Sequence, residues 1–142
     1  MSLQLVEITN KDDHVLESYR FLEKRIFSIS HGSMPSFEEH ADFVANNPYR
    51  FWFFIKSDDD YLGTIYLQHD NSIGVNLQPF HLPLIPEVLA IVTQLCNPLP
   101  AVPSVRRGQF FLNISPADLE LQKTVKEMGA YEIQRSFALP DM

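Results

Sequence analysis

Acidic side chains next to expected turns and helix starts are the groups in this sequence best suited to proton transfer. Asp70 stands where a general base could act, although as a residue before Asn71 it also suits a turn. Glu38, Glu39 and His40 open a helical segment and could hold a cationic amine or a sugar hydroxyl. The structural alternative is that the two glutamates cap that helix and complement its dipole.

Other reactive side chains favour no specific site. The five histidines show no spacing typical of zinc ligands, so no metal site is predicted. Cys96 lies on the apolar side of an expected helix, where a buried thiol is favoured over a nucleophile. The aromatic run at 51–54 is typical of a core strand, and the net charge of −7 disfavours nucleic acid as a partner.

The length of 142 residues and the 45% hydrophobic content predict one globular domain over residues 1–142. The first nine residues lack a basic start followed by an apolar run, so no signal peptide is expected. The most apolar stretch, residues 82–102, contains prolines and Glu87, which excludes a membrane helix. With one cysteine as well, the sequence predicts a cytoplasmic protein without a membrane partner.

Hydrophobic periodicity predicts an α+β (mixed α/β) fold with a central mixed sheet of about six strands and four helices. Ser36 with Glu39 forms a capping-box pattern, and residues 49–56 are apolar on both faces, as in a strand covered on two sides. The expected strands are 3–9, 49–56, 61–68, 72–78, 105–114 and 131–139, and the expected helices are 12–27, 36–47, 86–96 and 118–128.

This order, with a three-stranded antiparallel meander ahead of a helix, resembles the GNAT superfamily of acyl-CoA-dependent N-acyltransferases. Segments 52–77 and 110–134 carry the likeness, and 33–44 is similar to the branch that acts on amino sugars. The resemblance implies that strands 72–78 and 105–114 splay apart and hold the pantetheine arm of acetyl-CoA between them. An acceptor amine would then attack the thioester directly.

The resemblance also implies roles for particular residues. We expect acetyl transfer to a primary amine of a small molecule, for example an amino sugar nucleotide. The implied catalytic residues are Asp70 and Asp118, and the implied substrate-binding residues are Glu38 and His40. The implied cofactor-binding residues are Val75, Leu77, His81, Leu82, Leu84, Arg107 and Asn113.

The sequence departs from the family where the coenzyme's pyrophosphate is bound. Residues 80–86 contain no glycine, and Pro83 and Pro86 each lack an amide donor. No Lys or Arg occurs from 57 to 105, so Arg106 or Arg107 would have to compensate. We expect Phe80, Leu82 and Leu84 to fill part of the cleft.

Two further departures concern catalysis and assembly. Val125 stands where the family often has a tyrosine acid, and one strand replaces a closing C-terminal hairpin, so the hairpin is truncated. An open sheet edge would allow a homodimer. The alternative functions are an inactive binding or assembly module that has lost acetyl-CoA, and one half of a pair of biosynthetic partners.

Overall fold

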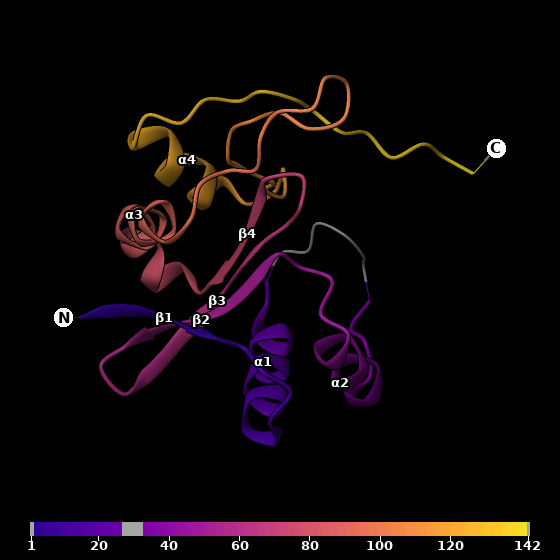
Figure 1. The fold of residues 1–142 in the computed structure, drawn as a ribbon, viewed down its shortest axis with the longest axis vertical. Coiled ribbons are helices and arrows are strands. Elements are labelled where there is room, and N and C mark those ends of the chain that lie inside the picture. The colour runs from indigo at the N-terminus through magenta and orange to yellow at the C-terminus, as the bar shows by residue number, and fades with distance from the viewer. Residues whose placement is uncertain (1, 27–32, 142) are drawn as a thin grey trace.

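The computed structural model describes residues 2–26 and 33–141 and shows one mixed sheet with helices on both faces (Figure 1). The expected end of the first helix, at Phe27, lies outside the described residues. The elements are β1 (Leu3–Glu7), α1 (Asp12–Lys24), α2 (Phe37–Ala45), β2 (Phe51–Ser57), β3 (Asp60–Leu67), β4 (Ser72–Leu77), the 3-10 helix η1 (Pro79–Leu84), α3 (Ile85–Leu95), β5 (Phe111–Leu112) and α4 (Leu119–Glu127).

The sheet order is β1-β2-β3-β4-β5, with antiparallel pairing from β1 to β4 and parallel pairing of β5 with β4. Helices α1 and α2 cover one face, and α3 and α4 cover the other (Figure 1). Alternate residues of β2 enter the two cores: Trp52 and Phe54 pack towards α1 and α2, whereas Ile55 packs with Val88 and Val92 of α3. The prediction of a strand covered on two sides is confirmed.

Helix α2 begins at the predicted capping box. The Ser36 hydroxyl accepts a hydrogen bond from the Glu39 amide at 3.1 Å, and the Glu39 carboxylate accepts one from the Ser36 amide, also at 3.1 Å. These bonds stabilise the ionised carboxylate and lower the pKa of Glu39. The capping interpretation of Glu39 is therefore confirmed.

Two predicted strands are wrong in extent or kind. Only Phe111–Leu112 of the expected strand 105–114 forms a strand. The chain turns back at Ser104, and Arg106 forms an isolated β-bridge with Val102 instead of joining the sheet. The expected strand 131–139 is extended chain without strand pairing, so the sheet has five strands instead of six. A strand needs a neighbour, and the periodicity of one segment does not supply it.

Asn71, in the turn between β3 and β4, connects the sheet to the proline-rich segment 97–108. It is fully buried and has a positive φ of 74°. Its side-chain amide donates to the carbonyls of Leu99 at 2.9 Å and Arg107 at 2.8 Å, and its Oδ1 accepts from the Leu99 amide at 2.7 Å. Its own carbonyl accepts from the Phe111 amide at 3.2 Å, which starts β5 beside β4.

His40 lies in the core between α1 and α2. Its side chain is 2% exposed, its Nε2 lies 2.8 Å from the Ser18 hydroxyl, and its ring packs edge-on against Trp52. Burial disfavours the charged imidazolium and lowers the pKa of His40. The histidine therefore joins two helices from within the core instead of lining an open surface.

Every helix in the described part of the chain falls short of the length and apolar character needed to cross a membrane.

Replacing Asn71 by glycine tests the connection between β4 and the segment 97–108. Glycine keeps the positive φ but removes all three side-chain hydrogen bonds, leaving buried amide and carbonyl groups without partners. We expect the free energy of unfolding to fall by about 2–4 kcal/mol. Urea denaturation measures this change.

Asp58→Gly is the matched control, because Asp58 also has a positive φ, 53°, but is exposed. We expect it to change stability by about 0.5 kcal/mol or less. Equal effects of the two substitutions would show that backbone conformation matters at Asn71 and the side-chain bonds do not.

The buried His40 predicts a pH-dependent stability. Because its pKa is lowered on folding, the unfolded chain binds the proton more tightly than the folded chain does. The stabilisation is complete above the unfolded-state value of about 6.5 and is lost as pH falls below it. We expect Tm to fall between about pH 7.5 and 5.5, and to fall less in His40→Gln, as measured by thermal scans.

His69→Gln is the control for this experiment, because His69 is exposed. It should keep the pH dependence of the parent chain. The same slope in His40→Gln as in the parent would contradict the assignment to His40.

Candidate functional site

Strands β4 and β5 part soon after they begin. Their parallel pairing covers only Ser72 with Phe111 and Ile73 with Leu112. Beyond this point β4 continues to Leu77 along β3, while the other chain leaves the sheet to reach α4 (Figure 1). The expected divergence of the two strands is present, although the second strand is much shorter than expected.

The divergence leaves one edge of β4 without a neighbouring strand. The Gln68 amide donates to the Ser72 carbonyl at 2.9 Å, so even-numbered residues of β4 direct their backbone groups towards β3. The backbone groups of Ile73, Val75 and Leu77 therefore point into the gap. Only Ile73 is within the pairing with β5, so the gap-facing N–H and C=O of Val75 and Leu77 have no strand partner among the described residues.

A cleft of about 50 Å³ lies in this gap, at the end of β4. Both faces of the sheet contribute to it: the end of α1 lines it from one side, and η1 and the start of α4 line it from the other. Residues from both faces of the sheet therefore meet at the open edge of β4. The lining residues of the cleft are Arg25, Ile26, Val75, Asn76, Leu77, Gln78, Pro79, Leu82, Asp118 and Leu121.

Four residues proposed from the sequence meet in this cleft, namely Val75, Leu77, Leu82 and Asp118. Asp118 is the N-cap of α4, where its Oδ1 accepts from the Leu121 amide at 3.1 Å. Its second carboxylate oxygen makes no hydrogen bond with any described residue, so it can accept one from a ligand. Leu82 is buried against Leu121 and narrows the cleft.

The remaining candidates near β4 lie outside the cleft. Asp70 is exposed in the turn before β4, where its Oδ1 accepts from the Ser72 amide at 2.8 Å as a turn residue. Arg107 is also exposed, at the same end of β4 as Asp70, and its carbonyl accepts from Asn71. Asn113 follows β5 directly.

The other candidates belong to η1 and α2. His81 packs edge-on against Phe80, and Leu84 packs into the core beneath α3. Phe80 is 84% exposed and does not fill the cleft, whereas Leu82 does. Glu38 is exposed in the first turn of α2, and His40 is enclosed between α1 and α2.

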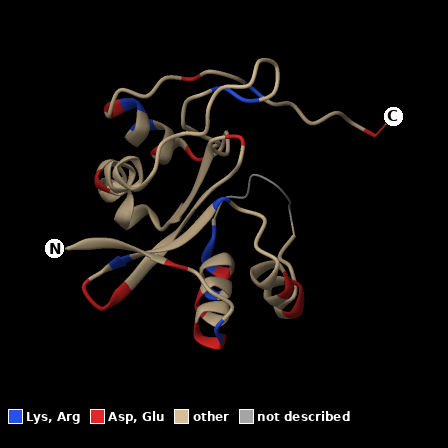
Figure 2. Cartoon of the chain, viewed as in Figure 1, with Lys and Arg blue, Asp and Glu red and all other residues tan. Residues whose placement is uncertain are grey.

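The junction of η1 and α3 offers little to bind a phosphate group. Pro86 has no amide hydrogen, and the Ile85 amide already donates to the Leu82 carbonyl. No lysine or arginine lies on η1 or α3 (Figure 2). Arg106 does not compensate, because its guanidinium binds the carbonyls of Pro100 at 2.8 Å and His69 at 3.3 Å, at the opposite end of β4.

No sequence pattern identified three residues that lie in or near the cleft. Arg25 follows α1, whose end is held by two side-chain amides: Asn76 donates to the Phe21 carbonyl and Gln78 donates to the Lys24 carbonyl, both at 2.9 Å. Tyr49 and Tyr66 stack with their ring centroids 4.2 Å apart on the same face of the sheet. Burial raises the pKa of both phenols, and the nearby positive charge of Arg25 opposes that rise.

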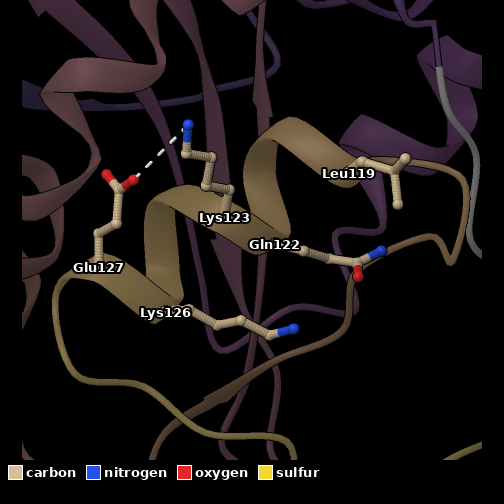
Figure 3. A pocket seen from close by; sticks show the side chains of 5 residues that line it. All are labelled: Leu119, Gln122, Lys123, Lys126 and Glu127. Atoms are coloured by element: carbon tan, nitrogen blue, oxygen red, sulfur yellow. Dashed lines mark ion pairs between the residues drawn. The ribbon is translucent and has the colours of Figure 1, made fainter.

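A second hollow, of about 450 Å³, lies along the outer face of α4 (Figure 3). Leu119, Gln122, Lys123, Lys126 and Glu127 line it, and Lys123 pairs with Glu127 at 3.9 Å. This face of the helix points away from Leu121, which lines the cleft, so the two hollows are separate. No group of three metal-ligating side chains occurs within residues 2–26 and 33–141.

No protein-family model and no curated protein sequence matches the chain. Solved structures do match. AAC(6')-Iy, in complex with the bisubstrate analog CoA-S-monomethyl-acetylneamine, gives a TM-score of 0.61 at 13% identity, covering 100% of this chain and 99% of that one. A possible acetyltransferase from Clostridium difficile 630 gives 0.58 at 8% identity, with 99% and 97% covered.

An aminoglycoside acetyltransferase from an uncultured soil metagenomic sample, in complex with sisomicin, gives a TM-score of 0.52 at 12% identity and covers 98% of this chain and 97% of its own. At such low sequence identities, the likeness shows a shared fold and does not show a shared activity. The likeness extends over 98–100% of this chain. The chain therefore shares the fold of these acetyltransferase structures, in agreement with the fold that its resemblance to the GNAT superfamily implies.

Proposed function

We propose that the chain is an N-acetyltransferase that moves an acetyl group from acetyl-CoA to a primary amine of a small molecule. The observation that carries this proposal is the open edge of β4, where the backbone groups of Val75 and Leu77 face the cleft. Similarity to acetyltransferases over nearly the whole chain supports it.

The pantetheine arm of the coenzyme suits this edge because it is an extended chain with amide groups. Such a chain can add to an unpaired strand edge through main-chain hydrogen bonds, as peptides do. Val75 and Leu77 each offer one donor and one acceptor on the gap side. Apolar side chains of Leu82 and Leu121 close the cleft on the α3 and α4 side and exclude water from the arm.

The reaction in this cleft would need few side chains. The amine nitrogen attacks the thioester carbonyl carbon, the carbon–sulfur bond breaks, and the coenzyme leaves as a thiolate. A backbone N–H of β4 stabilises the negative charge that develops on the carbonyl oxygen. A cationic acceptor first releases one proton to solvent, because only the neutral amine has an electron pair for the attack. After the attack the nitrogen loses a second proton, which the free carboxylate oxygen of Asp118 accepts and passes through solvent to the thiolate.

The acceptor proposed here is a cationic amine, with amino sugars as the leading class. The exposed surfaces of α1 and α2 bear mainly acidic side chains (Figure 2), among them Asp12, Asp13, Glu38 and Glu39. These helices flank the face of the sheet from which Arg25 and Ile26 line the cleft. Asp12 and Asp13 lie at the start of α1 and Arg25 follows its end, so the acidic surface would attract a cationic substrate to this side of the molecule rather than hold it in the cleft. The structural neighbour crystallised with sisomicin supports the same class.

A second candidate function is a binding module that keeps the fold without the coenzyme. The cleft of about 50 Å³ is smaller than ligand pockets usually are, roughly 300–1,000 Å³. The η1–α3 junction also lacks lysine and arginine, and Pro86 there has no amide hydrogen to donate to a pyrophosphate. Calorimetry with acetyl-CoA separates the two candidates, because the module would give no binding heat.

Val75→Pro tests the use of the β4 edge. Proline removes the gap-facing N–H and leaves the hydrogen bonds to β3 in place, since those belong to the even-numbered residues. We expect the affinity for acetyl-CoA to fall about tenfold, the effect of one lost hydrogen bond. Calorimetric titration measures it.

Val75→Ala is the matched control, because it shortens the side chain and keeps the N–H. Its affinity should stay within about twofold of the parent, while circular dichroism verifies that both variants are folded. Equal losses in the two variants would indicate side-chain contact and contradict recognition by the backbone.

Asp118→Asn tests proton acceptance. Asparagine caps a helix as well as aspartate does, so α4 should remain intact. An amide cannot accept the proton, and we expect kcat at neutral pH to fall about 10²- to 10⁴-fold with unchanged acetyl-CoA affinity. Steady-state kinetics with an amine acceptor measure the loss.

The control is Glu120→Gln, which removes one negative charge two residues after Asp118. Glu120 lies in the first turn of α4 but does not line the cleft. This variant should retain the parent kcat. A comparable fall in both variants would assign the effect to the charge of the first turn of α4 rather than to proton transfer.

A further inference from the structure

The end of α1 places a cation in the cleft that the proposed reaction does not use. Arg25 directly follows α1, is half-buried and lines the cleft. The side-chain amides of Asn76 and Gln78 hold this end of the helix through their bonds to the Phe21 and Lys24 carbonyls. The backbone that carries the Arg25 side chain is therefore fixed by contacts with the strand that forms the open edge.

Arg25 forms no ion pair in the described part of the chain. The ion pairs there join other residues, and residues 27–32, which come soon after Arg25, contain no Asp or Glu in the sequence. Asp118 lines the same cleft from the side of α4, but the two groups do not form an ion pair. The cleft therefore holds one cation and one anion, contributed from opposite faces of the sheet, that do not neutralise each other.

Two tyrosines lie near Arg25 on the same face of the sheet. The Tyr66 hydroxyl lies over Gly74, the residue of β4 that directly follows the last one paired with β5. Tyr49 stacks on Tyr66, and neither hydroxyl makes a hydrogen bond with a described residue. Burial raises the pKa of both phenols, and the positive charge of Arg25 only partly opposes that rise. Both phenols therefore stay protonated at neutral pH and can donate a hydrogen bond to an anion.

We propose that Arg25 binds an acidic group of the acceptor, a carboxylate or a phosphate, with the Tyr66 hydroxyl as a neutral donor nearby. The inference rests on the function proposed above and narrows its acceptor to amines that also carry a negative charge. The amine then lies towards Asp118 and the acidic group towards Arg25, so each charge of the acceptor meets the opposite charge. A guanidinium can bind either acidic group through two parallel hydrogen bonds. An acceptor that carries amines alone would meet the like charge of Arg25.

The coenzyme also carries phosphates, but the arrangement of the cleft favours the acceptor as the source of the anion. The charge of Arg25 acts on Tyr49 and Tyr66, which pack against the core on the α1 and α2 side of the sheet. A coenzyme arm that runs along β4 would leave the cleft where β4 continues into η1 and α3. Those two helices pack on the opposite face of the sheet, away from the two tyrosines.

Two matched pairs of acceptors test the proposal, namely β-alanine with β-alaninamide and phosphoethanolamine with ethanolamine. We expect kcat/KM to be at least about tenfold higher for the acidic member of one pair, the effect of one charge-assisted hydrogen bond. The pair that shows the preference distinguishes a carboxylate from a phosphate. Arg25→Gln should abolish the preference by lowering kcat/KM for the acidic member, while the neutral member stays within about twofold of the parent value.

Lys24→Gln is the matched control, because it removes the same charge one residue away and Lys24 is exposed outside the cleft lining. This variant should keep the preference for the acidic acceptor. Calorimetry with acetyl-CoA should give the same affinity for Arg25→Gln as for the parent. A loss of coenzyme affinity as large as the loss of preference would assign the anion to the coenzyme and overturn the proposal.

Binding of the acidic amines alone, followed by NMR titration without acetyl-CoA, separates this inference from the proposed function. The affinity for the preferred acidic amine should fall at least about tenfold in Arg25→Gln, because one charge-assisted hydrogen bond is lost. Equal kcat/KM within both pairs, or no binding of either acidic amine, overturns the inference even where neutral amines are acetylated. Acidic amines bound through Arg25 by a chain that binds no acetyl-CoA would overturn the proposed function and leave the anion site in place.

Discussion

The buried side chain of Asn71 determines how the second half of the chain meets the sheet. It satisfies backbone groups of Leu99 and Arg107, while its own carbonyl receives the Phe111 amide. A turn residue thereby fixes both the path of a proline-rich segment and the first pairing of β5. The parting of β4 from β5, and with it the cleft, depends on that starting point.

Local sequence patterns were sufficient to predict the features that depend on residues close to one another in the chain. The capping box of Ser36 and the two-faced strand around Trp52 and Phe54 depend on residues a few positions apart, and the structure has both. In contrast, the length of β5, and whether residues 131–139 form a strand, depend on which other strand is available for pairing. Sequence periodicity carries no such information, so these predictions failed.

The candidate site was predictable in part for the same reason. The resemblance to the GNAT superfamily implied roles for Val75, Leu77, Leu82 and Asp118, and these residues line one cleft. Arg25 enters the cleft from α1 through a long-range contact between Asn76 and Phe21, which no spacing reveals. The proposed recognition through backbone groups would leave few constraints on side-chain identity, which agrees with likeness to solved structures at 8–13% identity.

Gly74 lies midway along β4, under the ring of Tyr66, and any β-carbon there would collide with that ring. Tyr66 in turn stacks on Tyr49 and has little freedom to move aside. A larger residue would push β4 away from its antiparallel neighbour, just past the point where β5 departs. The aromatic pair therefore leaves room for nothing larger than glycine at the position of β4 that directly follows its last residue paired with β5.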